Sequence, residues 1–252
     1  MDKYYMSILT YFSIHLCYSF LKKENGIMGD IILFPQKEKR NIKSGKIMNS
    51  KYELIVRSLE DNPANQYNIK QAEELADKVL KTGGYFNIQA PLPIVNVASQ
   101  FDFSVFKQPN MKENESGNIY IGGKTNNIYN ANKVIIVGDQ EEYFHQRFII
   151  AHELGHYLMD YLNDPKLRDD SKLFSRAYLK SNHGDSIEKL RADRFAAELL
   201  MPAHIFVPQY IQATEKYYDR IYTVSYLSNF FKTKKSSIEK RIIEVMNNTF
   251  TY

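Results

Sequence analysis

Residues 144–162 read FHQRFIIAHELGHYLMDYL, and the motif H-E-x-x-H occupies residues 152–156 at the centre of this stretch. Apolar residues recur through it at steps of three and four, which is the period of one face of an α-helix. No proline interrupts the pattern, so we predict an amphipathic helix over the whole stretch. The residues of its apolar face are Phe144, Phe148, Ala151, Leu154, Leu158 and Leu162.

Two histidines lie four positions apart in this motif, His152 and His156. On a helix they project from the same face, one turn apart, so both imidazoles can bind one metal ion. Glu153 is rotated by about 100° from His152, which places its carboxylate beside the open coordination position rather than on the metal. That position suits a general base acting on a zinc-bound water. The alternative is a chance match with a buried structural pair of histidines; the helical context favours zinc.

The composition of the 252-residue chain is ordinary for a globular protein, with 44% hydrophobic and 25% charged residues. This length allows a substantial core. The formal net charge of +4 is too small to indicate nucleic-acid binding by itself. A single cysteine, Cys17, excludes an intramolecular disulfide and a cysteine-based zinc site. We therefore expect a cytoplasmic protein whose metal ligands are histidines and carboxylates.

The first 50 residues differ in character from the rest. Residues 6–23 have an apolar core of about fifteen residues, shorter than the twenty or so that a membrane span needs. They lack the basic leader and cleavage site of a signal peptide, and residues 35–51 are polar and basic, like a linker. We expect 1–50 to be an appended segment, with an ordered helix or a membrane anchor as alternatives and Met28 or Met48 as other possible starts. The remaining chain is divided into a peptidase core, 51–205, and a C-terminal helical region, 206–252.

Helical periodicity marks several further segments of the chain. It predicts helices over residues 51–59, 69–81, 187–200 and most of 203–244, and a helix start at Pro91 and Pro93. Residues 163–186 are mostly polar and are expected to form a loop. Gly155 inside the H-E-x-x-H motif costs roughly 1 kcal/mol of helix propensity, but it allows another element to approach the helix closely.

Short runs of β-branched and aromatic residues, separated by glycine and asparagine, predict strands. These runs are residues 101–107, 116–123, 126–130 and 132–139. We expect an antiparallel sheet, which together with the helices gives an α+β fold. In metalloproteases built of helices and a sheet, an edge strand beside the metal can bind an extended substrate. Either Tyr120–Gly123 or Lys133–Val137 is expected to be that edge strand.

A catalytic zinc site needs a third protein ligand, with water in the fourth position. The second predicted helix offers Glu188 and Asp193, and the loop before it offers His183 and Asp185. A carboxylate from a helix packed against an H-E-x-x-H helix is the ligand pattern of thermolysin-like enzymes. Such enzymes also stabilise the oxyanion with a tyrosine or histidine near the metal. Tyr178 and His183 are candidates for that role.

Two blocks of the sequence resemble one family. RFIIAHELGHYLM, residues 147–159, and ADRFAAELLMP, residues 192–202, are similar to the ImmA/IrrE-type zinc metallopeptidases, the repressor-cleaving peptidases. The resemblance spans about residues 68–245 and is specific in these two blocks. It implies a zincin-like core, in which the H-E-x-x-H helix packs on a small antiparallel sheet and on a second, ligand-bearing helix, followed by a helical tail.

The same resemblance implies roles for individual residues. Zn²⁺ would be bound by His152, His156 and a glutamate of the second helix, and Glu153 would be the catalytic base. Asp193 matches a polar position of the family. By that resemblance, its carboxylate would accept a hydrogen bond from one of the ligating imidazoles.

The third ligand is where this sequence departs from the family. Such enzymes place the ligand glutamate three residues before the alanine equivalent to Ala192, and Lys189 stands there. The nearest carboxylate, Glu188, lies one residue earlier and so about 100° around an ideal helix. Because the first turn of a helix is adaptable, Glu188 is the predicted ligand, with Asp193 or Asp185 as alternatives. Asp185 and Glu188 also have the spacing of a capping box, which is a purely structural interpretation.

The combined expectation is a cytoplasmic zinc metallo-endopeptidase that hydrolyses a peptide bond in a protein. By resemblance, the substrate is a helix-turn-helix repressor, cleaved in a mobile element or a stress response. The alternative is a catalytically silent, metal-poor interaction protein that binds a regulator.

Basic residues of the tail suggest DNA binding, but basic helix faces are usually just solvated. We therefore expect no direct contact with nucleic acid, and none with a membrane. The basic residues in question are Lys232, Lys234, Lys235, Lys240 and Arg241.

Overall fold

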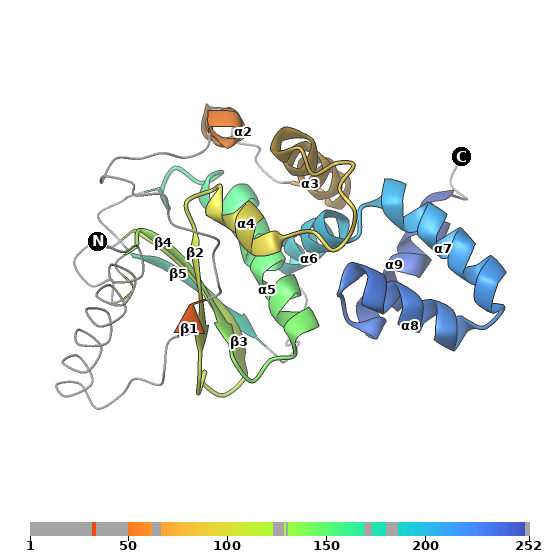
Figure 1. Ribbon diagram of the computed structural model, residues 1–252. Helices are drawn as coiled ribbons and strands as arrows, with labels where there is room; N and C mark the ends of the chain where they lie inside the picture. The colour runs from red at the N-terminus through yellow and green to blue at the C-terminus, as the bar shows by residue number, and fades with distance from the viewer. Residues whose placement is uncertain are drawn as a thin grey trace, which may run out of the picture.

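The computed structural model describes residues 32–33, 50–61, 67–122, 129, 131–168, 173–179 and 186–249. These residues form an α+β fold in which a mixed sheet is covered on one face by helices (Figure 1). The last three helices extend to the side away from the sheet. The predicted α+β class is therefore confirmed. Most of the segment 1–50 lies outside the described residues, and the division at residue 206 stays a prediction.

The sheet has five strands in the order β1-β2-β4-β3-β5. Their bounds are β1 Ile32–Leu33, β2 Ser104–Gln108, β3 Glu115–Ile121, β4 Lys133–Gly138 and β5 Phe174–Leu179. Three predicted strands correspond to β2, β3 and β4, although β2 begins three residues later than expected. The run at residues 126–130 lies almost wholly outside the described part of the chain.

The expectation of an antiparallel sheet is wrong for one pair of strands. β2 and β4 run parallel, with Val105 opposite Ile135. β3 returns in the direction opposite to β2, and β4 reverses again to pair antiparallel with β3. Because β4 lies between β2 and β3, it runs in the same direction as β2.

The expected edge strands are also wrong. Tyr120 and Ile121 belong to β3, which is paired on both sides, and residues 133–137 belong to β4, which is paired on both sides too. The edge on that side of the sheet is β5, inside the segment 163–186 that was expected to be a loop. Its alternate residues face the helices, and one of them is Arg176 rather than an apolar residue. Because a charged residue occupies this inward position, the sequence lacks the alternation of apolar and polar residues that predicts a strand.

The helices agree more closely with the sequence. Their bounds are α2 Ser50–Asp61, α3 Ile69–Gly83, α4 Ile94–Ser99, α5 Tyr143–His156, α6 Ile187–Leu200, α7 Ala203–Tyr217, α8 Arg220–Phe231 and α9 Lys235–Thr249, and a π-helical turn, η1, covers Tyr157–Tyr161 directly after α5. The N-cap of α6 is Ser186, whose side chain accepts from the Lys189 N–H. The helix begins at residue 187 as predicted, but the alternative capping box with Asp185 as the N-cap is wrong, because Ser186 is the N-cap. No helix among the described residues is long and apolar enough to span a bilayer.

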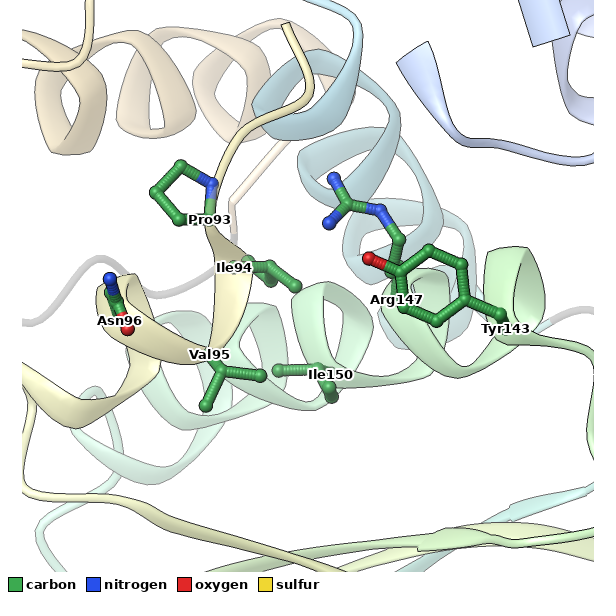
Figure 2. Close-up of a pocket in the computed structure, with 7 residues that line it drawn as sticks. All are labelled: Pro93, Ile94, Val95, Asn96, Tyr143, Arg147 and Ile150. Atoms are coloured by element: carbon green, nitrogen blue, oxygen red, sulfur yellow. The ribbon is translucent and has the colours of Figure 1, made fainter. Parts of the chain in front are cut away.

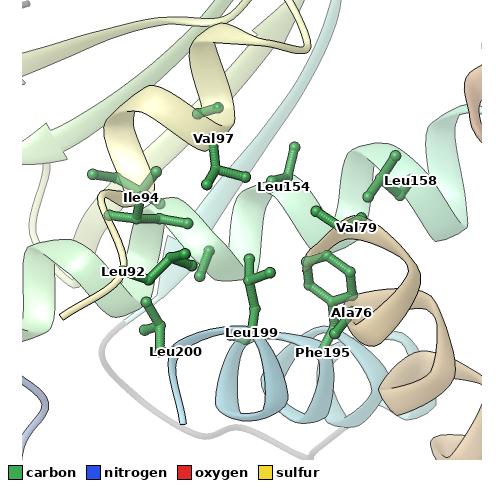
Figure 3. Close-up of a cluster of buried hydrophobic side chains, with 14 of the residues drawn as sticks. Ala76, Val79, Leu92, Ile94, Val97, Leu154, Leu158, Phe195, Leu199 and Leu200 are labelled. Carbon is green, nitrogen blue, oxygen red and sulfur yellow. The ribbon is translucent and has the colours of Figure 1, made fainter. Parts of the chain in front are cut away.

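The main core lies between α5 and the helices that pack on it (Figure 3). Leu154 and Leu158 meet Phe195 and Leu199 of α6 there. A Cβ on Gly155 would lie 3.1 Å from Cδ1 of Phe195 and 3.3 Å from the backbone Cα of Ala192. The glycine therefore lets α6 approach α5 closely, as the sequence indicated.

Arg147 ties the first half of α5 to two distant segments. Its Nη2 donates to the Leu92 carbonyl at 2.8 Å, and its Nε donates to the Lys232 carbonyl at 3.2 Å, in the turn between α8 and α9. The side chain is buried. Its charge therefore serves to join the tail helices to the core.

A second buried arginine, Arg241 of α9, makes the other main connection between the tail and the core. Its Nη2 is bonded to the Glu198 carboxylate of α6, and its Nε donates to the Met201 carbonyl at 3.2 Å. Its Nη1 lies 3.6 Å from Glu73 of α3 and 3.4 Å from Glu244. The predicted solvated basic face is thus wrong for Arg241, which is only 1% exposed.

Arg241→Met is expected to lower the free energy of unfolding by about 3–5 kcal/mol, because Glu198 is left buried without its partner. Urea denaturation followed by circular dichroism measures the loss. Adding Glu198→Gln to the same chain should recover part of the stability, since no buried charge then lacks a partner.

The matched control is Lys240→Met, which makes a similar change at the neighbouring exposed position. It should change the stability by less than about 0.5 kcal/mol. Equal effects of the two substitutions would contradict the role given to Arg241.

Candidate metal centre

The two histidines of the H-E-x-x-H motif lie together at the C-terminal end of α5. Their Nε2 atoms are 2.9 Å apart, and the rings meet edge to face with centroids 4.5 Å apart. Both residues are buried, with 3% and 2% of their surfaces exposed. The structure therefore brings His152 and His156 together as one candidate site, and their role as metal ligands stays a prediction.

The opposite nitrogen of each ring contacts a carboxylate. Nδ1 of His152 lies 2.8 Å from Oδ1 of Asp193 on α6, and Nδ1 of His156 lies 2.5 Å from Oδ2 of Asp160 in η1. Because a carboxylate accepts the hydrogen bond, the proton of each ring lies on Nδ1. In a neutral ring Nε2 then carries a lone pair, and this lone pair points toward the other imidazole. Asp193 thus lies where the sequence expected it, behind an imidazole.

Two inward lone pairs at this separation repel one another unless they share a cation. Burial is the main cause that lowers the pKa of His152, although its hydrogen bond to Asp193 opposes the shift. Burial, and then the neighbouring His152, holds the pKa of His156 well below its ordinary value. Both rings are therefore neutral at pH 7, the form that binds a metal. Two neutral, carboxylate-backed imidazoles with converging Nε2 atoms fit a divalent cation.

Glu153 is a buried carboxyl group in an environment that perturbs its pKa. It is completely buried, and neither carboxylate oxygen has a hydrogen-bond partner within the described part of the chain. Burial raises the pKa of Glu153 to about 8, while the charge of Arg176 opposes the shift. An unpartnered buried carboxyl group costs stability, and perturbed groups of this kind gather at functional sites.

Asp160 connects the imidazole pair to two arginines. Its Oδ2 lies 3.1 Å from Nη1 of Arg176 on β5, and its Oδ1 lies 3.3 Å from Nη2 of Arg191 on α6. Burial raises the pKa of Asp160 to about 6 although both arginines oppose the shift. Elements far apart in the sequence therefore converge behind His156.

The structure does not bring Glu188 to the imidazoles. Its side chain is 41% exposed, and its Oε1 lies 4.0 Å from Nη2 of Arg191. Across the residues that the structure describes, no three histidine, cysteine, aspartate or glutamate side chains are grouped so as to hold a metal. Asp185 and His183, the candidates from the preceding segment, lie outside those residues. The identity of the third ligand stays a prediction.

Tyr178 lies on β5, not in a loop as the sequence suggested. Its ring meets the His152 ring edge to face at 4.8 Å, and burial, followed by Asp193, raises the pKa of its hydroxyl. The hydroxyl therefore stays protonated at pH 7 and can donate a hydrogen bond to the site.

His145 was missed in the sequence. Its Nδ1 lies 2.7 Å from Oε2 of Glu141, whose other oxygen accepts from Ser116 at 2.8 Å, and its ring lies 5.7 Å from that of Tyr178. His145 precedes His152 by seven residues, or about two helical turns. That spacing on one face was a signal available in the sequence.

A small pocket beside α4 and the first half of α5 is separate from this site (Figure 2). It is lined by Pro93, Ile94, Val95, Asn96, Tyr143, Arg147 and Ile150. Arg147 is the charged residue of this lining, and its guanidinium is occupied by backbone carbonyls. We assign this pocket no role.

Comparisons with known proteins identify a family for this chain. A family model, peptidase M78, described as the IrrE N-terminal-like domain, matches residues 98–242. Comparison with curated proteins gives no significant match. Among solved structures, a Mycobacterium tuberculosis transcriptional regulator has 15% identity and a TM-score of 0.41, over 75% of this chain and 50% of that chain. The present chain thus spans about half the length of that regulator.

The matched region covers more than half of the chain and includes the H-E-x-x-H helix, the edge strand β5 and the helix α6. It contains both sequence blocks on which the resemblance to the ImmA/IrrE type was based, so that prediction is confirmed. The chain belongs to the peptidase M78 family, the metallopeptidase-type family of the IrrE N-terminal-like domain.

Proposed function

We propose that this chain is a zinc-dependent endopeptidase with a zincin-like core. The observation that carries the proposal is the pair of imidazoles on α5, whose Nε2 atoms are 2.9 Å apart, beside the fully buried Glu153, which has no hydrogen-bond partner among the described residues. Structural histidine pairs do not need an unpaired carboxyl group next to them, whereas metal-assisted hydrolysis needs a base there.

The proposed ligands are His152, His156 and Glu188. These residues would hold Zn²⁺, which would act as a Lewis acid that polarises the scissile carbonyl and lowers the pKa of a bound water. Glu188 lies in the first turn of α6 and its side chain is 41% exposed, so we propose that it changes rotamer to reach the imidazoles when the metal binds. Asp193 already holds the tautomer of His152 through Nδ1.

Glu153 is the proposed general base. It takes a proton from the attacking water and later delivers that proton to the nitrogen of the leaving amine. Burial raises its pKa to about 8, so the carboxyl group is mainly protonated at pH 7 in the metal-free protein. A bound divalent cation would favour the ionised form that a general base needs. Tyr178, whose ring packs on His152, is suited to donate a hydrogen bond to the carbonyl oxygen of the substrate.

β5 is the proposed binding strand for the substrate. It pairs with β3 on one side, and no other described strand pairs with its outer side. An extended peptide can add to such an edge through main-chain hydrogen bonds. Arg176 and Tyr178 on this strand lie next to the imidazole pair, so a peptide added here would pass close to Glu153.

The proposed substrate is a helix-turn-helix repressor, because the ImmA/IrrE resemblance implies one. The single cysteine supports a cytoplasmic setting for this cleavage. The alternative function is a metal-poor interaction protein that binds a regulator. It is favoured by the distance of Glu188 from the imidazoles and by Lys189, whose Nζ lies 3.5 Å from the Asp193 carboxylate.

Zn²⁺ should raise the thermal midpoint of the metal-free protein, because a ligand that binds only the folded state stabilises it. At a free concentration 100 times the Kd the gain is about 2.7 kcal/mol. Glu188→Ala should lose most of that gain, measured by differential scanning calorimetry with and without zinc.

Glu239→Ala on the exposed face of α9 is the matched control and should retain the full gain. A protein without substitutions that gains nothing from zinc would favour the metal-poor alternative. If Glu188→Ala keeps the stabilisation by zinc, the third ligand is a residue other than Glu188.

Glu153→Gln should abolish peptide hydrolysis while leaving zinc binding intact. Gln is neutral and of equal size, so this variant should also be at least as stable as the parent protein, since the buried carboxyl group has no hydrogen-bond partner in the described part of the chain. Cleavage of a helix-turn-helix repressor offered as substrate, followed by mass spectrometry, measures the activity. If the Glu153→Gln variant cleaves the substrate at the same rate as the parent protein, Glu153 is not the base.

A further inference from the structure

Asp160 is the most constrained carboxylate near the candidate metal centre. Its Oδ2 contacts Nδ1 of His156 and Nη1 of Arg176, and its Oδ1 contacts Nη2 of Arg191. Both oxygens are thus in use, and only 12% of the side chain is exposed. The carboxylate cannot rotate without breaking a charged hydrogen bond.

The two arginines are themselves held by different elements. Arg176 is fixed on β5, in the register where it faces Ile119 of β3. Arg191 of α6 is buried, and its Nη1 donates to the Tyr67 carbonyl before α3 at 3.0 Å. The position of Asp160 is therefore set by the sheet and by two helical segments at once.

The backbone at Asp160 is unusual as well. Tyr157–Tyr161 form a π-helical turn, closed by the bond from the Leu162 N–H to the Tyr157 carbonyl at 3.0 Å. π-Helical turns widen a helix locally and are frequent at functional sites. Here the turn begins directly after His156 and carries the carboxylate that contacts its ring.

The carboxylate behind the other imidazole is held less firmly. Asp193 is 31% exposed, and its second oxygen lies 3.5 Å from the flexible side chain of Lys189. The two rings are therefore not equivalent, because the carboxylate that contacts His156 is held by two arginines, whereas the carboxylate that contacts His152 is held less firmly.

We propose that Asp160, clamped by Arg176 and Arg191, is a positioning residue that presents Nε2 of His156 to the metal. It keeps the proton on Nδ1 and fixes the plane of the ring, which is how carboxylates behind a ligating histidine raise metal affinity. This inference rests on the proposed function, because it concerns metal binding at the same centre. A purely structural ion pair that joins η1, β5 and α6 is the competing explanation.

Asp160→Asn distinguishes the two explanations. It should lower the affinity for Zn²⁺ by about 10–100-fold, measured by competition with a chromophoric chelator. The visible absorption of the Co²⁺-loaded protein should change as well, because the geometry of the ligating ring changes. A structural ion pair predicts a lower thermal midpoint of the metal-free variant with no change in affinity or spectrum.

Asp164→Asn is the matched control. It makes the same chemical change four residues further on, where the carboxylate accepts from the Lys166 N–H at a turn. Its zinc affinity should equal that of the parent. Equal affinities of a folded Asp160→Asn variant and the parent would overturn the inference alone, whereas a parent that binds no zinc would overturn the proposed function and this inference together.

A second measurement needs no substitution. Long-range ¹H–¹⁵N spectra of the metal-free protein report which ring nitrogen of each histidine carries the proton. His156 should be in the Nδ1–H form. A proton on Nε2 of His156 would contradict the role of Asp160 even if Asp160→Asn fails to fold.

Discussion

The close contact between α5 and α6 at Gly155 is the constraint on which the rest of the site depends. A Cβ at this position would crowd Phe195 and the α6 backbone, so glycine lets the two helices approach this closely without a shift of the neighbouring atoms. The contact places Asp193 and Arg191 of α6 against the H-E-x-x-H face of α5. One imidazole is thereby oriented directly from α6 and the other through Asp160.

Burial then gives these groups their chemistry. The imidazoles are neutral because charging them inside the protein is costly, and Glu153 keeps a raised pKa for the same reason. Arg176, Arg191 and Lys189 surround the site as well. Their positive charge disfavours a bound cation, while Asp160 and Asp193 compensate for part of it. The affinity for metal is thus set by a balance of nearby charges.

The sequence predicted the parts of this site that repeat along one element. The spacing of His152 and His156 and the apolar period of residues 187–200 follow from helix geometry, and both agree with the structure. β5 was missed because Arg176 occupies an inward position, and its partner Asp160 comes from another element. The parallel pairing of β2 and β4 was not predicted, because the order of strands in a sheet depends on the long-range path of the chain. Local sequence patterns do not encode that path. The position of the third ligand depends on a side-chain rotamer in the first turn of α6, which spacing alone does not fix.

X-ray absorption at the zinc edge, on protein loaded with one equivalent of Zn²⁺, tests the central claim most directly. The account predicts two imidazole nitrogens and one carboxylate oxygen bound to the metal at about 2.0–2.2 Å, with a solvent oxygen in the fourth position. A spectrum with one imidazole or none in the coordination sphere would show that the pair on α5 is not a metal centre. It would leave this chain without the hydrolytic chemistry proposed for it.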